Sequence, residues 1–593
     1  MKKKPYKHTQ SYTRNKLSTK RKILLGELHL STGMILVAIK SKNFLNVTKS
    51  EKPNGPFSSW VNFLVTSFAF SISPSTLVHR TTMAAASDRR MRAFIRWMKH
   101  QGIDCSDALL ISTENSDASR PPSTSVKALC DLKEGDVVAT IPKQSCLTVR
   151  TSAANHLIDE AELGGYLGLA VAIMYEKSLG PQSKWFEYLQ ILPPFEPIPL
   201  LWSLPEIDSL LSGTELHKTV KEDKALVYQD WKECIQPILD MASFELNPDF
   251  FTVDEYLAAK SLVASRSFEI DEFHGFGMVP LADLFNHKTA AEDVHFTSLD
   301  SISESDKDIE SRKENEYDGN DIDDEPTAPD FHAEIEDLSQ SDLEISSVAG
   351  DESTYMEMII IKDVKAGAEV FNTYGHLGNA ALLHRYGFTE ADNPFDIVNI
   401  DLDIVVQWSL SLFSCRQSRK RLSFWKKLDY CGCVSQDSEY FEISIDGEPQ
   451  VELLVLLYIM LLTEEDFLEL DLALSAMGKV RNDSSFGLLT KENFLLTKVL
   501  EANKKVLLTQ DVCRALSSLA DARERLYGPK SLEEDIKSLN ECCQATDPKL
   551  FHSLILRVSE RRIIEKLRLF AASGSGISIT AEIRKKRKRV DRK

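Results

Sequence analysis

The stretch RSFEIDEFHGFGMVPLADLFNH, residues 266–287, decides the fold of this chain. Its apolar run, MVPLADLF, ends on the polar pair Asn286-His287. A second stretch, EVFNTYGHLGNAALLHRYGF at residues 369–388, has Tyr374-Gly375 directly after a short strand-like run and Tyr386-Gly387-Phe388 at the end of a helical one. Each feature alone is most often a turn or a surface residue, but this combination in one order is hard to obtain by chance.

The length and the cysteines limit the class of protein. A chain of 593 residues is too long for one ordinary core, so two or more domains are expected. The ten cysteines are scattered, and Cys431-Gly-Cys433 is the only closely spaced pair. A tetrahedral zinc site needs four ligands, and no second cluster supplies them. The pattern therefore predicts reduced thiols in the cytosol or nucleus and no metal.

The net charge of −19 is concentrated in one segment. Between Asp300 and Glu352 the chain has twenty acidic and three basic side chains, a charge of −17. A segment of such low hydrophobicity cannot bury enough surface to offset its ordering entropy, so we expect a disordered loop over about 297–355. Because this loop interrupts the fold, its ends are expected to lie close together, as in a long hairpin insertion.

Residues 1–82 differ from the rest of the chain. They open with a basic, acid-poor stretch, and the apolar run WVNFLVTSFAFSIS that follows is too short to span a bilayer comfortably. Three interpretations remain open: an organelle transit peptide, a signal anchor, or translated upstream sequence with Met83 as the true start. We favour the last, because an amphipathic helix begins soon after Met83, with one face made of Met91, Phe94, Ile95 and Met98.

The periodicity along the chain predicts an α+β protein. Residues 122–150 alternate as strands do, with a turn at Lys133–Asp136, and residues 161–265 are helical. Strands resume near Met278, and MEMIIIKDVKAGAEVFNTY predicts strand, turn and strand. From Val406 to Phe570 the pattern is helical almost throughout, and the chain ends in the basic run RKKRKR.

The two opening stretches resemble the core of SET-domain methyltransferases, in the class of the Rubisco large-subunit lysine methyltransferase and its nuclear and ribosomal relatives. The resemblance covers roughly residues 90–570. It implies a β-rich SET domain of short strands with a pseudoknot-like core, followed by an all-α substrate-binding domain. The expected divisions are a poorly structured basic N-terminus (1–82), the SET domain (83–390) with a helical insertion (161–265) and the acidic loop (297–355), the all-α domain (391–572) and a basic tail (573–593).

The resemblance also implies the cofactor, S-adenosylmethionine, and the roles of the site residues. Tyr374 matches the active-site tyrosine, and Tyr386 resembles the aromatic residue that lines the lysine channel. The residues that resemble cofactor contacts are Arg266 for the methionine carboxylate, the backbone of Asn286 and His287 for the adenine and amino groups, Tyr374, and Phe388 over the adenine. Asp283 is expected to be structural and to hold the Asn-His turn.

The expected reaction is methyl transfer to a lysine amine of a protein. A lysine with a pKa near 10.4 must lose a proton before it attacks, and an apolar channel favours the neutral form. Two alternatives stay open: a catalytically weak SET protein that acts as a binding module, and a histidine methyltransferase. The first is favoured by the segment RPPSTSVKAL, because the class usually has a glycine-containing turn there and this chain has no glycine between Gly102 and Gly135.

The same resemblance leaves the substrate protein open among histones, ribosomal proteins and transcription factors. We expect a monomer that binds neither nucleic acid stably nor membranes. The basic run at Arg584–Arg589 is of the kind read as a nuclear import signal. The expected location is therefore the nucleus, with the cytoplasm as a further site, or the chloroplast if residues 1–82 are a transit peptide.

Overall fold

The computed structural model describes residues 89–114, 123–241, 245–298, 354–428, 440–479 and 504–574. Residues 1–82, nearly all of the acidic segment, Cys431-Gly-Cys433 and the run RKKRKR lie outside these ranges, so the predictions about them stay predictions. No helix in the described ranges is long and apolar enough to cross a membrane.

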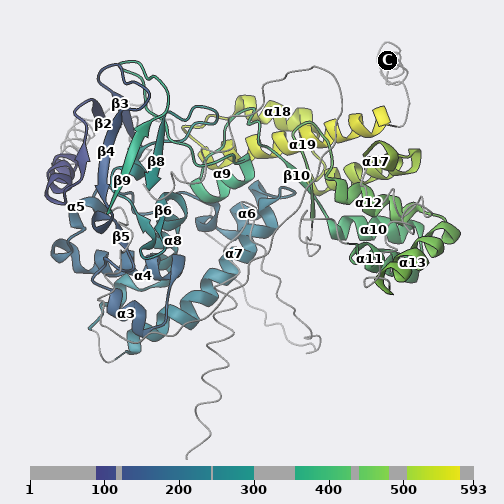
Figure 1. Cartoon of the computed structure of the whole chain (residues 1–593), viewed down its shortest axis with the longest axis horizontal. Coiled ribbons are helices and arrows are strands. Elements are labelled where there is room, and N and C mark those ends of the chain that lie inside the picture. Colours follow the sequence, from purple (N-terminus) through teal and green to yellow (C-terminus); the bar gives the residue numbers. More distant parts are fainter. Residues whose placement is uncertain are drawn as a thin grey trace, which may run out of the picture. The chain divides into compact units, whose positions relative to one another are not determined.

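Short antiparallel strands form three sheets in the first half of the fold (Figure 1). The largest sheet has four strands in the order β1-β4-β9-β8, a second sheet pairs β2 with β3, and a third has the order β5-β7-β6. In β4, Val138, Ala139 and Ile141 are buried, whereas Val137 is exposed beside a shift in the pairing with β9. The strands are β1 (Asp104–Cys105), β2 (Leu109–Glu114), β3 (Ser123–Ala128), β4 (Val137–Pro142), β5 (Leu147–Thr148), β6 (Ser267–Asp271), β7 (Gly275–Met278), β8 (Val294–Ser298) and β9 (Tyr355–Ile360).

The segment after β9 differs from its prediction. The strand over MEMIII is confirmed, but residues 369–373 form no continuous strand. They pair through single bridges, Lys127 with Glu369 and His287 with Asn372. The segment passes first beside β3 and then beside residues 286–287. It pairs with each neighbour over too few residues to form a β-ladder. This crossing is the pseudoknot-like core, and it brings the two opening stretches of sequence together.

Helices occupy the middle of this half, where the insertion was expected. They are α3 (Asn155–Glu160), α4 (Gly165–Leu179), α5 (Phe186–Leu189), α6 (Leu204–Leu210), α7 (Leu216–Asp230) and α8 (Val253–Arg266). A helix over residues 89–100 packs Phe94, Trp97 and Met98 into the same core as α4 and α8. Ile95 was expected on its buried face but is 37% exposed, whereas Trp97 is buried and donates from Nε1 to the Lys184 carbonyl at 2.7 Å.

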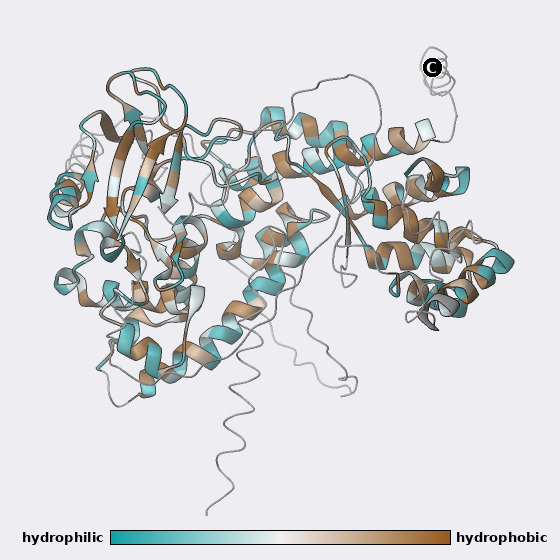
Figure 2. Ribbon diagram, in the orientation of Figure 1, coloured by the Kyte–Doolittle hydropathy of each residue, from teal (hydrophilic) through white to brown (hydrophobic). Residues whose placement is uncertain are grey.

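The second half is mainly helical and has its own core. In α12 every residue from Glu452 to Met460 is buried, and its ribbon is largely brown, the hydrophobic colour, in Figure 2. Buried apolar residues of α10, α12 and α17 belong to the same core. The helices are α9 (Asn379–Tyr386), α10 (Leu402–Leu412), α11 (Cys415–Trp425), α12 (Val451–Leu461), α13 (Glu464–Lys479), α16 (Lys504–Leu507), α17 (Gln510–Glu524), α18 (Leu532–Glu541) and α19 (Pro548–Gly574).

This half is not all-α, contrary to the expectation for residues 391–572. Strands β10 (Val398–Asp401) and β11 (Tyr440–Ile443) form an antiparallel pair. Each strand has four residues, which is too short for its alternation to stand out between long helical patterns.

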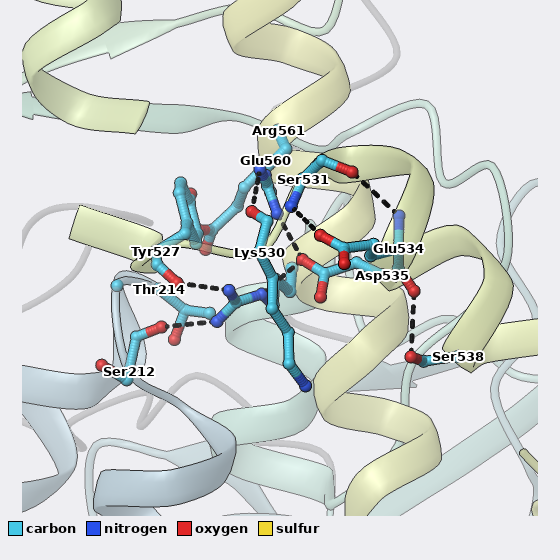
Figure 3. Close-up of polar contacts among 12 residues, drawn as sticks. Ser212, Thr214, Tyr527, Lys530, Ser531, Glu534, Asp535, Ser538, Glu560 and Arg561 are labelled. Atoms are coloured by element: carbon cyan, nitrogen blue, oxygen red, sulfur yellow. Dashed lines mark hydrogen bonds and ion pairs between the residues drawn. The ribbon is translucent and has the colours of Figure 1, made fainter. Parts of the chain in front are cut away.

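Buried arginines of the C-terminal helices donate hydrogen bonds to backbone carbonyls of the loop after α6. Arg557 donates to the Ser212 carbonyl at 3.0 Å and pairs with Asp535 at 2.6 Å, while Arg523 donates to the Gly213 carbonyl at 2.6 Å. Figure 3 shows Ser212 in this network, near Tyr527 and Asp535. Because these charges are buried and paired, removing one partner would leave the other without compensation.

Candidate functional site

The crossing of residues 286–287 with residues 372–374 assembles the centre of the site. The Asn372 N–H donates to the Asn286 carbonyl at 2.9 Å, and the Tyr374 N–H donates to His287 Nδ1 at 3.0 Å. His287 Nδ1 is therefore an acceptor, which requires a neutral ring with its proton on Nε2. Burial lowers the pKa of His287, in agreement with this neutral form.

Four aromatic rings gather at this crossing. The His287 and Tyr374 rings stack with centroids 5.0 Å apart, and Tyr374 lies 4.5 Å from Tyr386. Phe388 lies 6.2 Å from His287 and 6.3 Å from Tyr386. The structure thus brings together the four ring residues that the sequence singled out, although Tyr386 and Phe388 come from the end of α9 and the turn after it.

The Tyr374 hydroxyl points back into the protein backbone. It donates to the Phe285 carbonyl at 3.1 Å. Burial raises the pKa of Tyr374, so the phenol stays protonated and remains a donor. Tyr374 is therefore connected to the 285–287 segment twice, through its backbone N–H and through its hydroxyl.

Asn286 lies at the edge of this centre. Its side-chain amide donates to the Thr124 carbonyl at 3.1 Å and to Glu369 at 2.8 Å. These bonds attach the Asn-His pair to the start of β3, close to the segment that lacks the expected glycine. That segment lies partly outside the described residues, which begin again at Ser123.

Arg266 is the last residue of α8 and is already engaged within the protein. Its Nε donates to Glu196 at 2.6 Å, and its Nη1 donates to the backbone carbonyl of Asp283 at 2.9 Å. The Asp283 carboxylate lies 3.6 Å from Nη1. Burial alone would lower the pKa of Arg266, but the charges of Glu196 and Asp283 raise it, so the guanidinium stays charged. Nη2 has no hydrogen-bond partner among the described residues.

Asp283 was expected to be structural and to hold the Asn-His turn, but its carboxylate contacts other residues. Its carboxylate accepts a hydrogen bond from Tyr188 at 2.8 Å and faces Arg266. Its Oδ1 is buried without a hydrogen-bond partner in the described part of the chain. Burial raises the pKa of Asp283 to about 6, although Arg266 opposes this shift. Two residues earlier, Leu281 is a non-glycine residue with a φ of +79°, so the backbone here is strained.

Tyr188 and Glu196 were not identified from the sequence. Tyr188 bonds Asp283, and Glu196 bonds Arg266. Glu196 lies in the segment LPPFEPIP, whose prolines break any periodicity. No local signal could identify it, because its partner lies 70 residues further along the chain.

The side chains present are suited to S-adenosylmethionine. The Nη2 donor of Arg266 can bond a carboxylate, and Phe388 has an aromatic ring of the kind that packs on an adenine. Over the described ranges, no group of three or more His, Cys, Asp or Glu residues is placed to hold a metal ion.

Comparison with known proteins gives relatives of one kind. The chain is 23% identical over 396 residues to N-lysine methyltransferase setd6 of Salmo salar, covering 64% of this chain and 75% of that one. It is 27% identical over 326 residues to ribosomal lysine N-methyltransferase 3 of Saccharomyces cerevisiae, covering 47% of this chain and 59% of that one. No model of a protein family matches the chain.

Solved structures share its fold. Rubisco LSMT bound to AdoMet superposes with a TM-score of 0.54 at 18% identity, over 82% of this chain and 92% of that one. The SET domain of LSMT bound to lysine and AdoHcy gives the same TM-score and identity. The chain therefore has the SET-domain fold of the Rubisco large-subunit methyltransferase class and is related in sequence to protein-lysine N-methyltransferases.

Proposed function

We propose that the protein transfers methyl groups from S-adenosylmethionine to the side-chain amine of lysine in a protein substrate. The observation that carries the proposal is the joining of Asn286-His287 to Tyr374 through one backbone crossing, with Tyr386 and Phe388 around it. The curated relatives are lysine methyltransferases, and LSMT has been solved with AdoMet, AdoHcy and lysine.

Each side chain has a role that its environment supports. We assign Arg266 Nη2 to the cofactor carboxylate, the backbone of Asn286 and His287 to its adenine and amino groups, and Phe388 to the adenine face. Tyr386 lines the channel of the acceptor lysine. Tyr374 stays a neutral phenol, and its hydroxyl donates to the Phe285 carbonyl. The hydroxyl oxygen held in this way orients the acceptor nitrogen.

The chemistry of the transfer sets what these residues must do. When bound, S-adenosylmethionine would supply an electrophilic methyl group to a lysine nitrogen that has already lost its proton, with S-adenosylhomocysteine as the leaving group. Tyr374 and Tyr386 would keep water from the acceptor amine, and this loss of hydration disfavours the charged ammonium. The neutral His287 adds no positive charge next to the acceptor.

Cell extract treated with the purified protein and labelled cofactor tests this function. Mass spectrometry of the labelled proteins should find methyl groups on lysine, and calorimetry should detect binding of S-adenosylmethionine. Methylation of histidine instead would establish the histidine alternative. Cofactor binding without any transfer would favour the binding-module alternative, and the absence of both would contradict the proposal.

We further propose that residues 391–572 bind the substrate protein, which we expect to be a histone, a ribosomal protein or a transcription factor. One relative is named for ribosomal lysine methylation. We expect the protein to act as a monomer without stable binding to nucleic acid or membranes. Chromatography with light scattering at several concentrations tests the monomer, and the proteins found by mass spectrometry test the substrate class.

The nucleus is the location we propose, with the cytoplasm as a further site. The run RKKRKR at Arg584–Arg589 supports it. A fluorescent fusion that begins at Met83 should accumulate in the nucleus, and replacement of the six basic residues by alanine should shift it to the cytoplasm. Equal distribution of the two fusions would contradict the import signal. Localisation of the full chain alone to a chloroplast would support a transit peptide in residues 1–82.

A further inference from the structure

The loop between α5 and α6 reaches the proposed site from a part of the chain with no recognisable motif. Glu196 lies on this loop, and its side chain is 12% exposed. The loop is fixed to α8 because the Glu196 N–H donates to the hydroxyl of the fully buried Ser261 at 2.9 Å. This hydrogen bond anchors the backbone at Glu196, from which the side chain extends to Arg266.

This loop also contacts the aromatic side of the site. Gly387, between Tyr386 and Phe388, has a φ of +78°, and a Cβ atom built there would lie 3.2 Å from the Pro197 carbonyl. The Pro197 carbonyl also accepts from Trp202 Nε1 at 3.4 Å. The loop is therefore placed against both Arg266 and the turn that carries the two aromatic residues.

We propose that Glu196 is a positioning residue for the cofactor, which holds Arg266 by Nε so that Nη2 stays available to a carboxylate. The inference rests on the proposed function. A guanidinium is planar and rigid, so fixing Nε and Nη1 fixes the direction of Nη2. Glu196 and the Asp283 carbonyl occupy those two positions, at 2.6 and 2.9 Å.

Asp283 explains why the loss of Glu196 should matter. The Asp283 carboxylate lies 3.6 Å from Nη1, and its Oδ1 has no hydrogen-bond partner in the described ranges. Without Glu196, the guanidinium can turn towards this carboxylate and form a two-point pair with it. The N–H donors of Arg266 would then bond the Asp283 carboxylate, and the cofactor carboxylate would lose its partner.

Calorimetry with S-adenosylmethionine and S-adenosylhomocysteine on the full chain tests the role of Glu196. Glu196→Ala should raise the Kd of both by about tenfold, whereas Glu196→Gln, which keeps an acceptor oxygen, should raise it less. With cell extract as methyl acceptor, the KM for cofactor should rise with the Kd, and the rate at saturating cofactor should change by less than about twofold.

The matched control is Glu206→Gln, which removes an ion-paired carboxylate from the same insertion, 2.8 Å from Lys549 and away from Arg266. It should leave the cofactor Kd unchanged. If the wild type binds cofactor and both Glu196 variants bind it equally well, this inference alone is overturned, as it is if Glu206→Gln has the same effect. If the wild type does not bind cofactor, the proposed function fails too. If Glu196→Ala does not fold, Glu196→Gln decides the matter.

Discussion

Within the described part of the chain, the Tyr374 hydroxyl makes one hydrogen bond, to the Phe285 carbonyl at 3.1 Å. Tyr374→Phe removes only this group, so the fold should persist with a loss of about 1 kcal/mol. Methyl transfer should fall on the order of 100-fold, because the acceptor nitrogen loses its orienting oxygen. Transfer rates and calorimetric cofactor binding measure the two effects. Tyr256→Phe, which removes another buried hydroxyl, is the control, and a variant with the wild-type rate would show that Tyr374 has no such role.

Asp283 should make the stability depend on pH. Its pKa rises from 3.8 to about 6 on folding, mainly because of burial. Between these values the folded chain holds a proton that the unfolded chain has released, so stability is lost as pH rises from about 4 to about 6. Asp283→Asn cannot ionise and escapes this loss. Its stability relative to wild type should therefore improve across that interval, by at most about 3 kcal/mol. Urea unfolding at several pH values checks this, and a constant difference would contradict it.

At the scale of elements, the loop after α6 meets the turn after α17 very closely. Gly213 has a φ of +82°, and a Cβ atom there would lie 2.6 Å from the Leu526 carbonyl oxygen and the Tyr527 Cα. Gly213→Ala should therefore disturb the buried ion pairs of Arg523 and Arg557, which donate to Gly213 and Ser212. We expect a loss of about 3 kcal/mol or more.

Gly367 provides the matched control for this substitution. Its φ of +83° is nearly the same, but no atom lies within 4 Å of a Cβ built there. Gly367→Ala should cost only the backbone strain, about 1–2 kcal/mol. Thermal unfolding of both variants separates strain from close approach, and equal losses would show that the contact with the C-terminal helices is unimportant.

At the scale of the whole molecule, the acidic segment connects two strands that are already paired. Ser298 in β8 lies opposite Met356 in β9. Replacing residues 301–350 by a short Gly/Ser loop should therefore change Tm by less than about 2 °C. If the segment steers basic substrates, kcat/KM for a basic peptide should fall at low salt and match the wild type at high salt. A large drop in Tm would show that the segment is packed.

The sequence by itself determined the order of the parts. The apolar run of α12 is a local pattern, because side-chain periodicity reports which face of an element is buried. Such patterns were enough to predict an α+β protein. The four ring residues that meet in the site were singled out by the resemblance of two short stretches to SET-domain methyltransferases.

Only the tertiary structure decided which groups meet. It placed Glu196 on Arg266, 70 residues away, and Tyr188 on Asp283, 95 residues away. It also divided the segment before Tyr374 between two neighbours, so that no second strand formed there. A local pattern cannot specify such partners, because they come from segments that are distant in the sequence and meet only when the chain packs. A buried charge is tolerated there only if an opposite charge or a hydrogen-bond partner contacts it.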